Sequence, residues 1–534
     1  MGVATNLFWM LDRSARASYG GEEALVFGDR SLSFRELRDR ALRFAAGLKG
    51  QGLGPGSRVA VLMGNRLEWP EVLFGLAAAG AICVPVNVLL TGRELEHLLS
   101  DSGAACMVMD ELGLTAAATL SHPPQFVITV GAAQAPAGAR GIAYEDLMSS
   151  GGASSAPAIE QPELNDPFIY YYSSGTTGLP KAAVHTHNCV LWNSIVQIDD
   201  LGLDRDVTYL VVPSLSWAAG FHNLVLALLW KGGRSAIMPT GGLTIDRIAD
   251  AVEKHGVTHT MLVPTLIRQL AADEAALARL RGTKLRWIIT GAEPVPTHLV
   301  AELGAALPGC SVCQAYGLSE FPSICTVLAP EEALTRNGSA GRPLSHSRLA
   351  VRQDDDTIAD VGRGELLVRS PANMIGYHNS PEKTAEALRD GWVNTGDLAD
   401  IDKDGYVFII GRTKDMVISG GLNVYPKEIE EVLNGQPGVL EVAVVGVPDE
   451  KYGERVVAII VENGQTAVDT AALGRTCREQ LAGYKSPRDF LVRRDLLPRN
   501  VSGKIMKREL RPWAEEQLQL ARTLSDQRLS ALSG

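Results

Sequence analysis

The sequence predicts an α/β fold, with a large N-terminal domain of α/β sheets that carry helices on both faces and a small α+β C-terminal domain. The chain has 534 residues, more than one hydrophobic core accommodates, so we expect at least two domains. Helix and strand patterns alternate over about the first four hundred residues, which is typical of a largely parallel sheet. Beyond that point, short strand patterns follow one another at close spacing.

The first helix and strand repeat begins at a capping box, the pattern S-x-x-E. Ser33 and Glu36 form this box, and apolar residues then recur at helical spacing as far as Leu48. The segment GLGPG ends the predicted helix, and RVAVLM at 58–63 predicts a buried strand.

The same pattern recurs further along the chain. Thr91 and Glu94 form a second capping box, and a strand is predicted at 105–110 after that helix. A third helix is predicted at 245–255, and Gly256 ends it before the strand pattern VTHTMLV.

One apolar run, Val72 to Leu90, has almost the length of a membrane span. Pro85 and Asn87 interrupt it, so a buried helix followed by a buried strand is the better interpretation. The N-terminal residues match neither a signal peptide nor a myristoylation site. We therefore expect no membrane span.

The C-terminal part has a different pattern. Strands are predicted at 405–411, 439–449 and 454–462, with a short helix at 425–433 and a polar helix at the C-terminus. A charged segment, GRTKDM, separates this module from the rest. We predict an N-terminal domain at 1–411, a hinge at 412–415 and a C-terminal domain at 416–534.

Charge and cysteine content restrict the class of protein. The net charge is −11 and there is no long basic run, which argues against nucleic acid as a partner. The seven cysteines have no framework spacing. We therefore expect a reducing, cytoplasmic location.

The stretch YYYSSGTTGLPK at 170–181 has the composition of a phosphate-binding loop. It holds seven hydroxyl side chains, two glycines and one lysine in twelve residues. Glycines let backbone N–H groups converge on an anion, hydroxyl groups donate hydrogen bonds, and a lysine adds positive charge. Taken alone, the stretch is also compatible with a Ser/Thr-rich turn.

Further motifs settle this choice, because they stand in the order found in one family. They are YYSSGTTGLPK, GAEP, QAYGLSE, GRP, WVNTGD, GRTKDMVISGGLNVYPKEIE, LAGYKSP and PRNVSGKIMKREL. On these motifs the chain resembles the adenylate-forming superfamily over residues 30–512: acyl-CoA synthetases, peptide-synthetase adenylation domains and luciferases. It departs from the family pattern at Ser173 and Ser319, where threonine is usual, and both residues keep a hydroxyl group.

The resemblance implies a role for each matching residue. The residues expected to bind ATP are Ser173, Ser174, Gly175, Thr176, Thr177, Gly178, Lys181, Gly291, Ala292, Glu293, Ala315, Tyr316, Gly317, Asp397 and Arg412. The residues expected to be catalytic are Lys504, Ser319 and Glu320. Glu320 is also the expected Mg²⁺ ligand, since Mg²⁺ prefers carboxylate and phosphate oxygens.

The acid and thiol sites are implied in the same way. The residues expected to line the acyl pocket are Ser216, Trp217, Phe221 and His222. The residues expected to bind coenzyme A are Gly420, Gly421, Leu422, Tyr452 and Lys485. The C-terminal module is expected to be mobile and to rotate about Lys414 between the two half-reactions.

The implied activity is that of an ATP-dependent carboxylic acid–CoA ligase that uses ATP, Mg²⁺ and coenzyme A. The acid and ATP give acyl-AMP and pyrophosphate, and CoA then gives acyl-CoA and AMP. We expect a fatty or bulky hydrophobic acid, with an aryl acid as the alternative. Two other functions stay open: loading the acid onto an acyl carrier protein, and an inactive nucleotide-binding scaffold. The oligomeric state, monomer or homodimer, also stays open.

Overall fold

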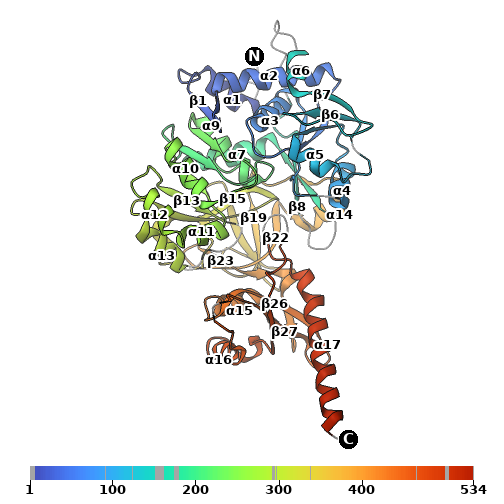
Figure 1. Cartoon of the computed structure of the whole chain (residues 1–534), viewed down its shortest axis with the longest axis vertical. Coiled ribbons are helices and arrows are strands. Elements are labelled where there is room, and N and C mark those ends of the chain that lie inside the picture. The colour runs from blue at the N-terminus through green and yellow to red at the C-terminus, as the bar shows by residue number, and fades with distance from the viewer. Residues whose placement is uncertain are drawn as a thin grey trace. The chain divides into compact units, whose positions relative to one another are not determined.

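The computed structural model describes residues 6–90, 92–122, 124–150, 162–173, 180–291, 295, 297–336, 338–464, 466–499 and 504–532. Figure 1 traces the chain from the N-terminus to the C-terminus. Its contacts define two compact units. The first unit is Met1–Leu349, Leu367–Thr395 and Asp404–Val407, and the second is Ala350–Leu366, Gly396–Lys403 and Phe408–Gly534. The division at 411 and the hinge at 412–415 stay predictions.

Within the described part of the first unit, one sheet has nine strands. Their order is β16 (Arg342–Pro343), β15 (Phe321–Leu328), β14 (Ser311–Leu318), β13 (Trp287–Thr290), β12 (His259–Met261), β10 (Thr208–Val211), β11 (Arg234–Ile237), β1 (Glu23–Phe27) and β2 (Arg30–Ser33). The pairs from β14 to β1 are parallel, and the antiparallel pairs lie at the two edges.

A second sheet of this unit has eight strands among the described residues. Their order is β20 (Gly376–Tyr377), β9 (Lys181–Thr186), β8 (Pro167–Ser173), β4 (Ile82–Pro85), β3 (Arg58–Leu62), β5 (Cys106–Met109), β6 (Phe126–Thr129) and β7 (Arg140–Ala143). All pairs from β8 to β7 are parallel. The prediction of a largely parallel α/β architecture is confirmed.

Two helices join these sheets through one apolar core. The core contains residues of α2 (Phe34–Gly50) and α3 (Glu68–Ala79) together with side chains of β1, β3 and β10. Every residue of α3 is buried, so other elements cover the helix on all sides. The run that begins at Val72 is thus a buried helix followed by the buried strand β4, as expected. No helix in the described ranges is long and apolar enough to span a membrane.

Two predicted helix termini are confirmed. The Ser33 hydroxyl accepts a hydrogen bond from the Glu36 N–H, and the Glu36 carboxylate accepts one from the Ser33 N–H at 2.8 Å. Helix α10 (Ile245–His255) ends at Gly256, whose φ of 62° is the left-handed conformation that glycine adopts without strain. The second predicted capping box includes Thr91, which lies outside the described residues.

The first unit contains further helices. They are α1 (Phe8–Arg16), α4 (Gly92–Ser102), α5 (Glu111–Ala117), α6 (Tyr144–Ser150), α7 (His187–Asp200), α8 (Ala218–Phe221), α9 (Val225–Lys231), α11 (Pro264–Ala271), α12 (Glu274–Leu280), α13 (Thr297–Ala306), α14 (Pro381–Ala387) and the 3₁₀ turn Pro330–Glu332. On the second sheet, α4 and α5 pack on the face opposite to α2 and α3. All seven cysteines of the chain are buried and none forms a disulfide.

Further strands occupy the stretch in which the chain passes between the two units. They are β17 (Arg348–Arg352), β18 (Ile358–Ala359), β19 (Gly362–Arg369), β21 (Leu388–Arg389), β22 (Trp392–Ile401) and β23 (Val407–Arg412). The unit boundaries fall inside β17, β19, β22 and β23.

The C-terminal part of the second unit has its own sheet and helices. The sheet consists of β24 (Val417–Ser419), β25 (Leu422–Val424), β26 (Val439–Asp449), β27 (Gly453–Glu462) and β28 (Asp489–Arg493). The helices are α15 (Pro426–Leu433), α16 (Thr470–Gln480) and α17 (Lys507–Leu532), with 3₁₀ turns at Thr413–Asp415 and Gly483–Lys485. Separate apolar cores join α15 and α16 to one face of the sheet and α17 to the other. The predicted strands 439–449 and 454–462 and the helix 425–433 are confirmed.

Candidate functional site

The predicted phosphate loop lies between two paired strands. Strands β8 and β9 are antiparallel, and Ser173 at the end of β8 pairs with Lys181 at the start of β9. The loop residues Ser174, Gly175, Thr176, Thr177 and Gly178 lie outside the described residues, as do Ala292 and Glu293. The strand pairing brings the ends of the loop together, and it places Lys181 where the loop rejoins the sheet.

Lys181 and Glu320 contact the same tyrosine, one at the ring and the other at the hydroxyl group. The Lys181 ammonium lies 4.5 Å from the ring centroid of Tyr377, and the Tyr377 hydroxyl donates a hydrogen bond to Glu320 Oε1 at 2.7 Å. Burial and the nearby Glu320 carboxylate raise the pKa of Tyr377, so its hydroxyl keeps its proton and acts as a donor. Tyr377 thus joins the predicted phosphate lysine to the predicted metal ligand.

Tyr377 was not predicted from the sequence, because sheet pairing creates its position. Strand β20 pairs antiparallel with β9, and Tyr377 lies opposite Ala183. The N–H of Met374 also donates to the carbonyl oxygen of Glu320 at 2.9 Å. An isolated Gly-Tyr pair has no motif strong enough to reveal these long-range contacts.

Ser319 and Glu320 occupy the tight turn between β14 and β15, in which Leu318 pairs with Phe321. A Cβ atom at Gly317 would lie 1.5 Å from the carbonyl oxygen of Ser323, so only glycine fits this hairpin. His185 Nε2 donates to the carbonyl oxygen of Ser319 at 2.8 Å, because only a protonated ring nitrogen can bond to a carbonyl. The turn is therefore held from both strands and from β9.

The other predicted ATP residues of the first unit lie along the neighbouring strand ends. Gly291 follows β13, and a Cβ atom there would lie 2.6 Å from the carbonyl oxygen of Ala315 on β14. This close approach explains the glycine and brings 291 and 315 together. Tyr316 is half-buried and pairs with Thr326 of β15.

The residues around Glu320 fit a magnesium ion. Glu320 is half-buried at the end of a strand, and within the described ranges the side-chain partner of its carboxylate is the Tyr377 hydroxyl. A carboxylate held by one hydrogen bond at the edge of a phosphate loop is the type of oxygen ligand that Mg²⁺ takes together with phosphate oxygens and water.

The segment predicted to line the acyl pocket follows β10 and contains α8. The Ser216 hydroxyl bonds to Ser214 at 2.8 Å, and Trp217 is half-buried. Phe221 is 1% exposed, and its ring lies 6.3 Å from that of Trp69 in the apolar core. His222 is also 1% exposed. Whether these residues contact an acid stays a prediction.

The second unit contains another group of predicted ATP residues. Arg412 Nε lies 3.1 Å from Asp397 Oδ1, and the Asp397 side chain is 10% exposed. Desolvation and the positive charges of Arg412 and Lys504 lower the pKa of Lys414 to about 8. Within this unit, Asp397, Arg412 and Lys504 thus each lie within electrostatic reach of Lys414.

The predicted CoA residues of the second unit fall into two places. Gly420 and Gly421 form the turn between β24 and β25, with φ values of 62° and 78°, as a type I′ hairpin requires. The Gly420 N–H donates to the Tyr452 carbonyl oxygen at 2.7 Å, and the Arg488 guanidinium lies 3.8 Å from the Tyr452 ring centroid. Leu422 is 49% exposed. Lys485, in contrast, forms an ion pair with Glu428 of α15.

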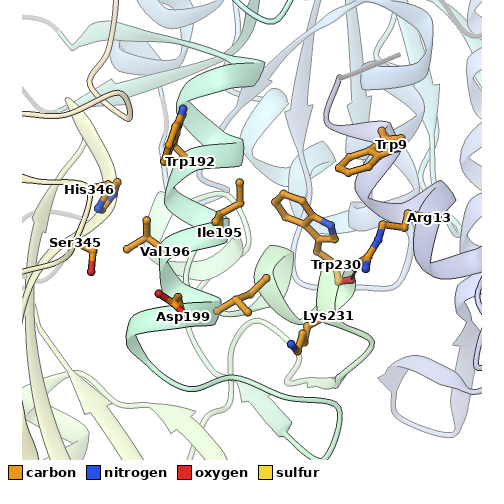
Figure 2. A pocket seen from close by; sticks show the side chains of 11 residues that line it. Trp9, Arg13, Trp192, Ile195, Val196, Asp199, Trp230, Lys231, Ser345 and His346 are labelled. Carbon is orange, nitrogen blue, oxygen red and sulfur yellow. Dashed lines mark hydrogen bonds between the residues drawn. The ribbon is translucent and has the colours of Figure 1, made fainter. Parts of the chain in front are cut away.

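A groove on the first unit contains none of the predicted site residues. Figure 2 shows Trp9 and Arg13 of α1, Trp192 and Ile195 of α7, and Trp230 of α9 around a volume of about 640 Å³. The ring centroids of Trp9 and Trp230 lie 5.6 Å apart in a T-shaped arrangement. The groove borders the outer face of α7.

Comparison with known proteins gives the family. The family model described as AMP-binding enzyme matches residues 11–378, and the model of the AMP-binding enzyme C-terminal domain matches residues 428–504. A feruloyl-CoA synthase of Amycolatopsis sp is 36% identical over 91% of this chain and 95% of its own length. A long-chain-fatty-acid–CoA ligase of Mycobacterium tuberculosis is 35% identical over 95% of this chain and 98% of its own.

A solved structure has the same fold. It is the o-succinylbenzoate coenzyme A synthetase of Bacillus subtilis in complex with ATP and a magnesium ion, which is 26% identical and covers 94% of this chain and 98% of its own, with a TM-score of 0.80. The two family models together match most of the chain. The predicted phosphate loop, Glu320 and Lys504 all lie within the matched residues. This protein belongs to the AMP-binding enzyme family, and it is an adenylate-forming acid–CoA ligase that uses ATP, Mg²⁺ and coenzyme A.

Proposed function

We propose that the ligase activates a bulky, largely apolar carboxylic acid next to the turn that carries Ser319 and Glu320. The observation that carries this proposal is the row formed by Lys181, Tyr377 and Glu320. It supplies a cation for the β- and γ-phosphates and a carboxylate for Mg²⁺ where the edge strand β20 of the eight-stranded sheet contacts the β14–β15 turn of the nine-stranded sheet. The Ser319 hydroxyl is the proposed donor to the α-phosphate.

Electrostatic repulsion between the two substrates explains why this reaction needs a cation and a metal-binding carboxylate beside the phosphates. Attack of a carboxylate on ATP brings two anions together, and each unit-charge pair at about 4 Å costs roughly 4 kcal/mol at an effective dielectric constant of 20. Lys181 and the ion held by Glu320 offset part of that cost. The fixed hydrogen bond from Tyr377 keeps the Glu320 carboxylate from turning away.

The second unit supplies the remaining proposed groups. Asp397 accepts hydrogen bonds from the ribose hydroxyl groups with Arg412 beside it, and Lys504 bridges the attacking carboxylate and the α-phosphate. Lys504 and the Gly420–Gly421 turn belong to the same unit. Because the two half-reactions need different parts of this unit at the reaction centre, we propose that the C-terminal domain rotates about Lys414 between adenylation and thioester formation.

The acid is proposed from the relatives and from the segment that contains α8. The two relatives named above act on a ferulic acid and on long-chain fatty acids, both of which are bulky and largely apolar. Trp217 and Phe221 provide an apolar wall of the same character. A cytoplasmic location is proposed because buried, unpaired cysteines suit a reducing compartment.

A panel of free acids, scored by AMP release with ATP, Mg²⁺ and CoA, tests the proposal. Aryl, alicyclic and fatty acids should be activated in preference to acetate and dicarboxylates. The Glu320→Gln variant controls for contaminating ligases, because it loses the charge that holds Mg²⁺ while keeping the size of the side chain. Replacing CoA with a holo acyl carrier protein measures the alternative acceptor. A folded protein that releases no AMP with any acid of the panel would be the nucleotide-binding scaffold.

A further inference from the structure

One buried polar side chain beside the proposed reaction centre has no role in the fold. His222 follows α8 directly and is 1% exposed, and neither nitrogen of its ring makes a hydrogen bond of normal length and angle with a described residue. Buried polar groups in proteins are normally paired, and leaving one unpaired costs about 1–3 kcal/mol. The imidazole can therefore bond to a group that the described residues do not supply.

Several polar side chains around His222 are paired with one another. Gln197 Nε2 donates to Asn193 Oδ1 at 2.5 Å, and Asn193 Oδ1 also accepts from the Ser323 N–H at 3.3 Å. The Ser323 hydroxyl in turn donates to Asn223. These side chains thus have partners, whereas the imidazole of His222 and Nδ1 of the neighbouring His185 have none of normal geometry among the described residues.

The backbone around His222 is held by hydrogen bonds on both sides, so the position from which the ring extends is fixed. Gln197, which is fully buried on α7, donates to the carbonyl oxygen of His222 at 2.8 Å and accepts from the N–H of Leu224 at 2.8 Å. One amide therefore clamps the turn on both sides of Asn223. The His222 N–H also donates to the carbonyl oxygen of Ala218 at 2.8 Å.

The position of the ring connects it to the reaction centre. The His222 ring lies 5.2 Å from the ring of Tyr171 in a T-shaped contact, and His185, which bonds to the Ser319 carbonyl, lies within electrostatic reach. The carbonyl oxygen of Pro322, two residues after Glu320, accepts a weak hydrogen bond from the ring, which leaves the other ring nitrogen without a partner among the described residues. His222 thus lies beside the turn that carries Ser319 and Glu320.

The chemistry of the ring limits what it can recognise. Burial and the neighbouring His185 lower the pKa of His222 to about 3, so the imidazole is neutral near pH 7. A neutral imidazole offers one N–H donor and one bare acceptor nitrogen. A hydroxyl group can bond to either, whereas an isolated charge would be poorly stabilised by a neutral partner at a buried site.

We propose that His222 recognises a hydroxyl group on the acyl part of the acid, and that the preferred substrates are bulky apolar acids that carry such a hydroxyl. The inference rests on the proposed function, in which the segment that contains α8 lines the acyl pocket. It makes His222 the residue that distinguishes a hydroxylated acid from an acid of the same shape with a methyl group instead. Gln197 is the positioning residue, because it holds the turn that carries the imidazole.

Matched pairs of acids test the proposal. The parent acids are phenylpropanoic, cinnamic, cyclohexanecarboxylic and decanoic acid. For each accessible position, one derivative carries a hydroxyl group and its matched derivative carries a methyl group. The kcat/KM of each derivative is measured by AMP release. For at least one position, the wild-type enzyme should prefer the hydroxylated acid by about tenfold or more. The ratio of kcat/KM for the hydroxylated acid to kcat/KM for the methylated acid should fall to about one in His222→Phe. It should stay partly preserved in His222→Gln, whose amide keeps a donor and an acceptor.

A matched variant separates recognition from general damage. His187 is also a buried histidine, but its Nδ1 accepts from the Leu7 N–H at 3.2 Å, so His187→Phe should leave the hydroxyl-to-methyl ratio unchanged. A merely structural His222 would lower kcat/KM for both members of a pair equally, and that result would overturn the inference.

The remaining outcomes are also decisive. A wild-type ratio near one for every pair overturns the inference whether or not His222→Phe folds, since this measurement needs no variant. If folded wild-type protein releases no AMP with any of the acids, the proposed function itself fails. Activation of acids without any preference for a hydroxyl group leaves the proposed function intact and removes the role of His222.

Discussion

The hydroxyl group of Tyr377 donates a hydrogen bond to the Glu320 carboxylate at 2.7 Å, while the Lys181 ammonium lies 4.5 Å from the centre of the same ring. One aromatic side chain thereby sets the spacing between a cation and an acid that are proposed to act on the same polyphosphate. The strand pairing that positions this ring makes the arrangement part of the sheet.

Tyr377→Phe should keep the ring and the contact with Lys181 but release the Glu320 carboxylate. Acid-dependent exchange of pyrophosphate into ATP should fall about tenfold, as for one lost hydrogen bond to a charged group, and half-saturation with Mg²⁺ should need a higher concentration. Tyr172→Phe is the matched control, because it removes a 2.7 Å hydrogen bond to Asp101 from the same sheet. Equal Mg²⁺ requirements in Tyr377→Phe and wild type would contradict this role.

Asp397→Ala should raise the KM for ATP strongly and leave the KM for the acid near its wild-type value. The physical reason is that a carboxylate with two acceptor oxygens is lost, and that Arg412, 3.1 Å away, loses its partner. Asp400→Ala, on the same strand, removes only a 3.8 Å contact with Arg363 and should leave the KM for ATP unchanged. Equal KM values for ATP in all three proteins would remove Asp397 from the nucleotide site.

Lys504→Ala should cripple formation of the acyl-adenylate by a factor on the order of 10²–10³, as for one lost transition-state donor. Conversion of supplied acyl-AMP and CoA to thioester should be nearly intact. Lys507→Ala is the control, since the Lys507 ammonium is paired with Glu430 at 2.7 Å and is not expected to reach ATP. Equal losses in both half-reactions of Lys504→Ala would rule out separate orientations.

Gly421→Trp should have the reverse effect and slow thioester formation while sparing adenylation. A tryptophan at the tip of the hairpin would obstruct the proposed thiol path, and the φ of 78° adds a backbone strain of roughly 1 kcal/mol. Gly421→Asn is the control, because asparagine tolerates this conformation and carries much less bulk. The two half-reactions are measured separately, as pyrophosphate exchange and as consumption of acyl-AMP with CoA.

The stability of the first unit should fall as the pH falls below about 6.5. Burial holds the pKa of His222 at about 3 and places four more at about 4, those of His185, His187, His259 and His346. Between pH 4 and 6.5 the unfolded chain therefore binds more protons than the folded one. Each histidine contributes a slope of up to about 1.4 kcal/mol per pH unit.

Urea unfolding between pH 7.5 and 5 checks this prediction. Tryptophan fluorescence reports on the first unit, because all tryptophans except Trp513 belong to it. The urea midpoint should decrease steadily over this range. A midpoint that stays constant down to pH 5 would show that these imidazoles take up protons without unfolding.

Local signals in the sequence predicted the elements that depend on local contacts. The capping box at Ser33 and the left-handed glycine at Gly256 each fix one helix terminus within a few residues, so both were found from the sequence alone. The strand patterns of β26 and β27 are likewise long enough to stand without tertiary context. The order of the motifs along the whole chain then indicated the family.

Long-range contacts could not be predicted in this way. Tyr377 reaches Glu320 only because β20 pairs with β9, and no periodicity encodes that pairing. Gln197 clamps the turn at His222 from another helix, through contacts that depend on how α7 packs against α8. The segment that contains His222 was expected to be mostly apolar, and the polar cluster beside it emerged only from the fold.

The burial of every cysteine has a consequence for an enzyme that handles a thiol. Thiol–disulfide exchange requires an accessible thiolate, and burial raises the pKa of Cys310, Cys313 and Cys325 to about 12. Oxidised coenzyme A therefore finds no sulfur on the folded surface with which to form a mixed disulfide. The enzyme can turn over in a thiol pool of varying redox state without being covalently capped by its own substrate.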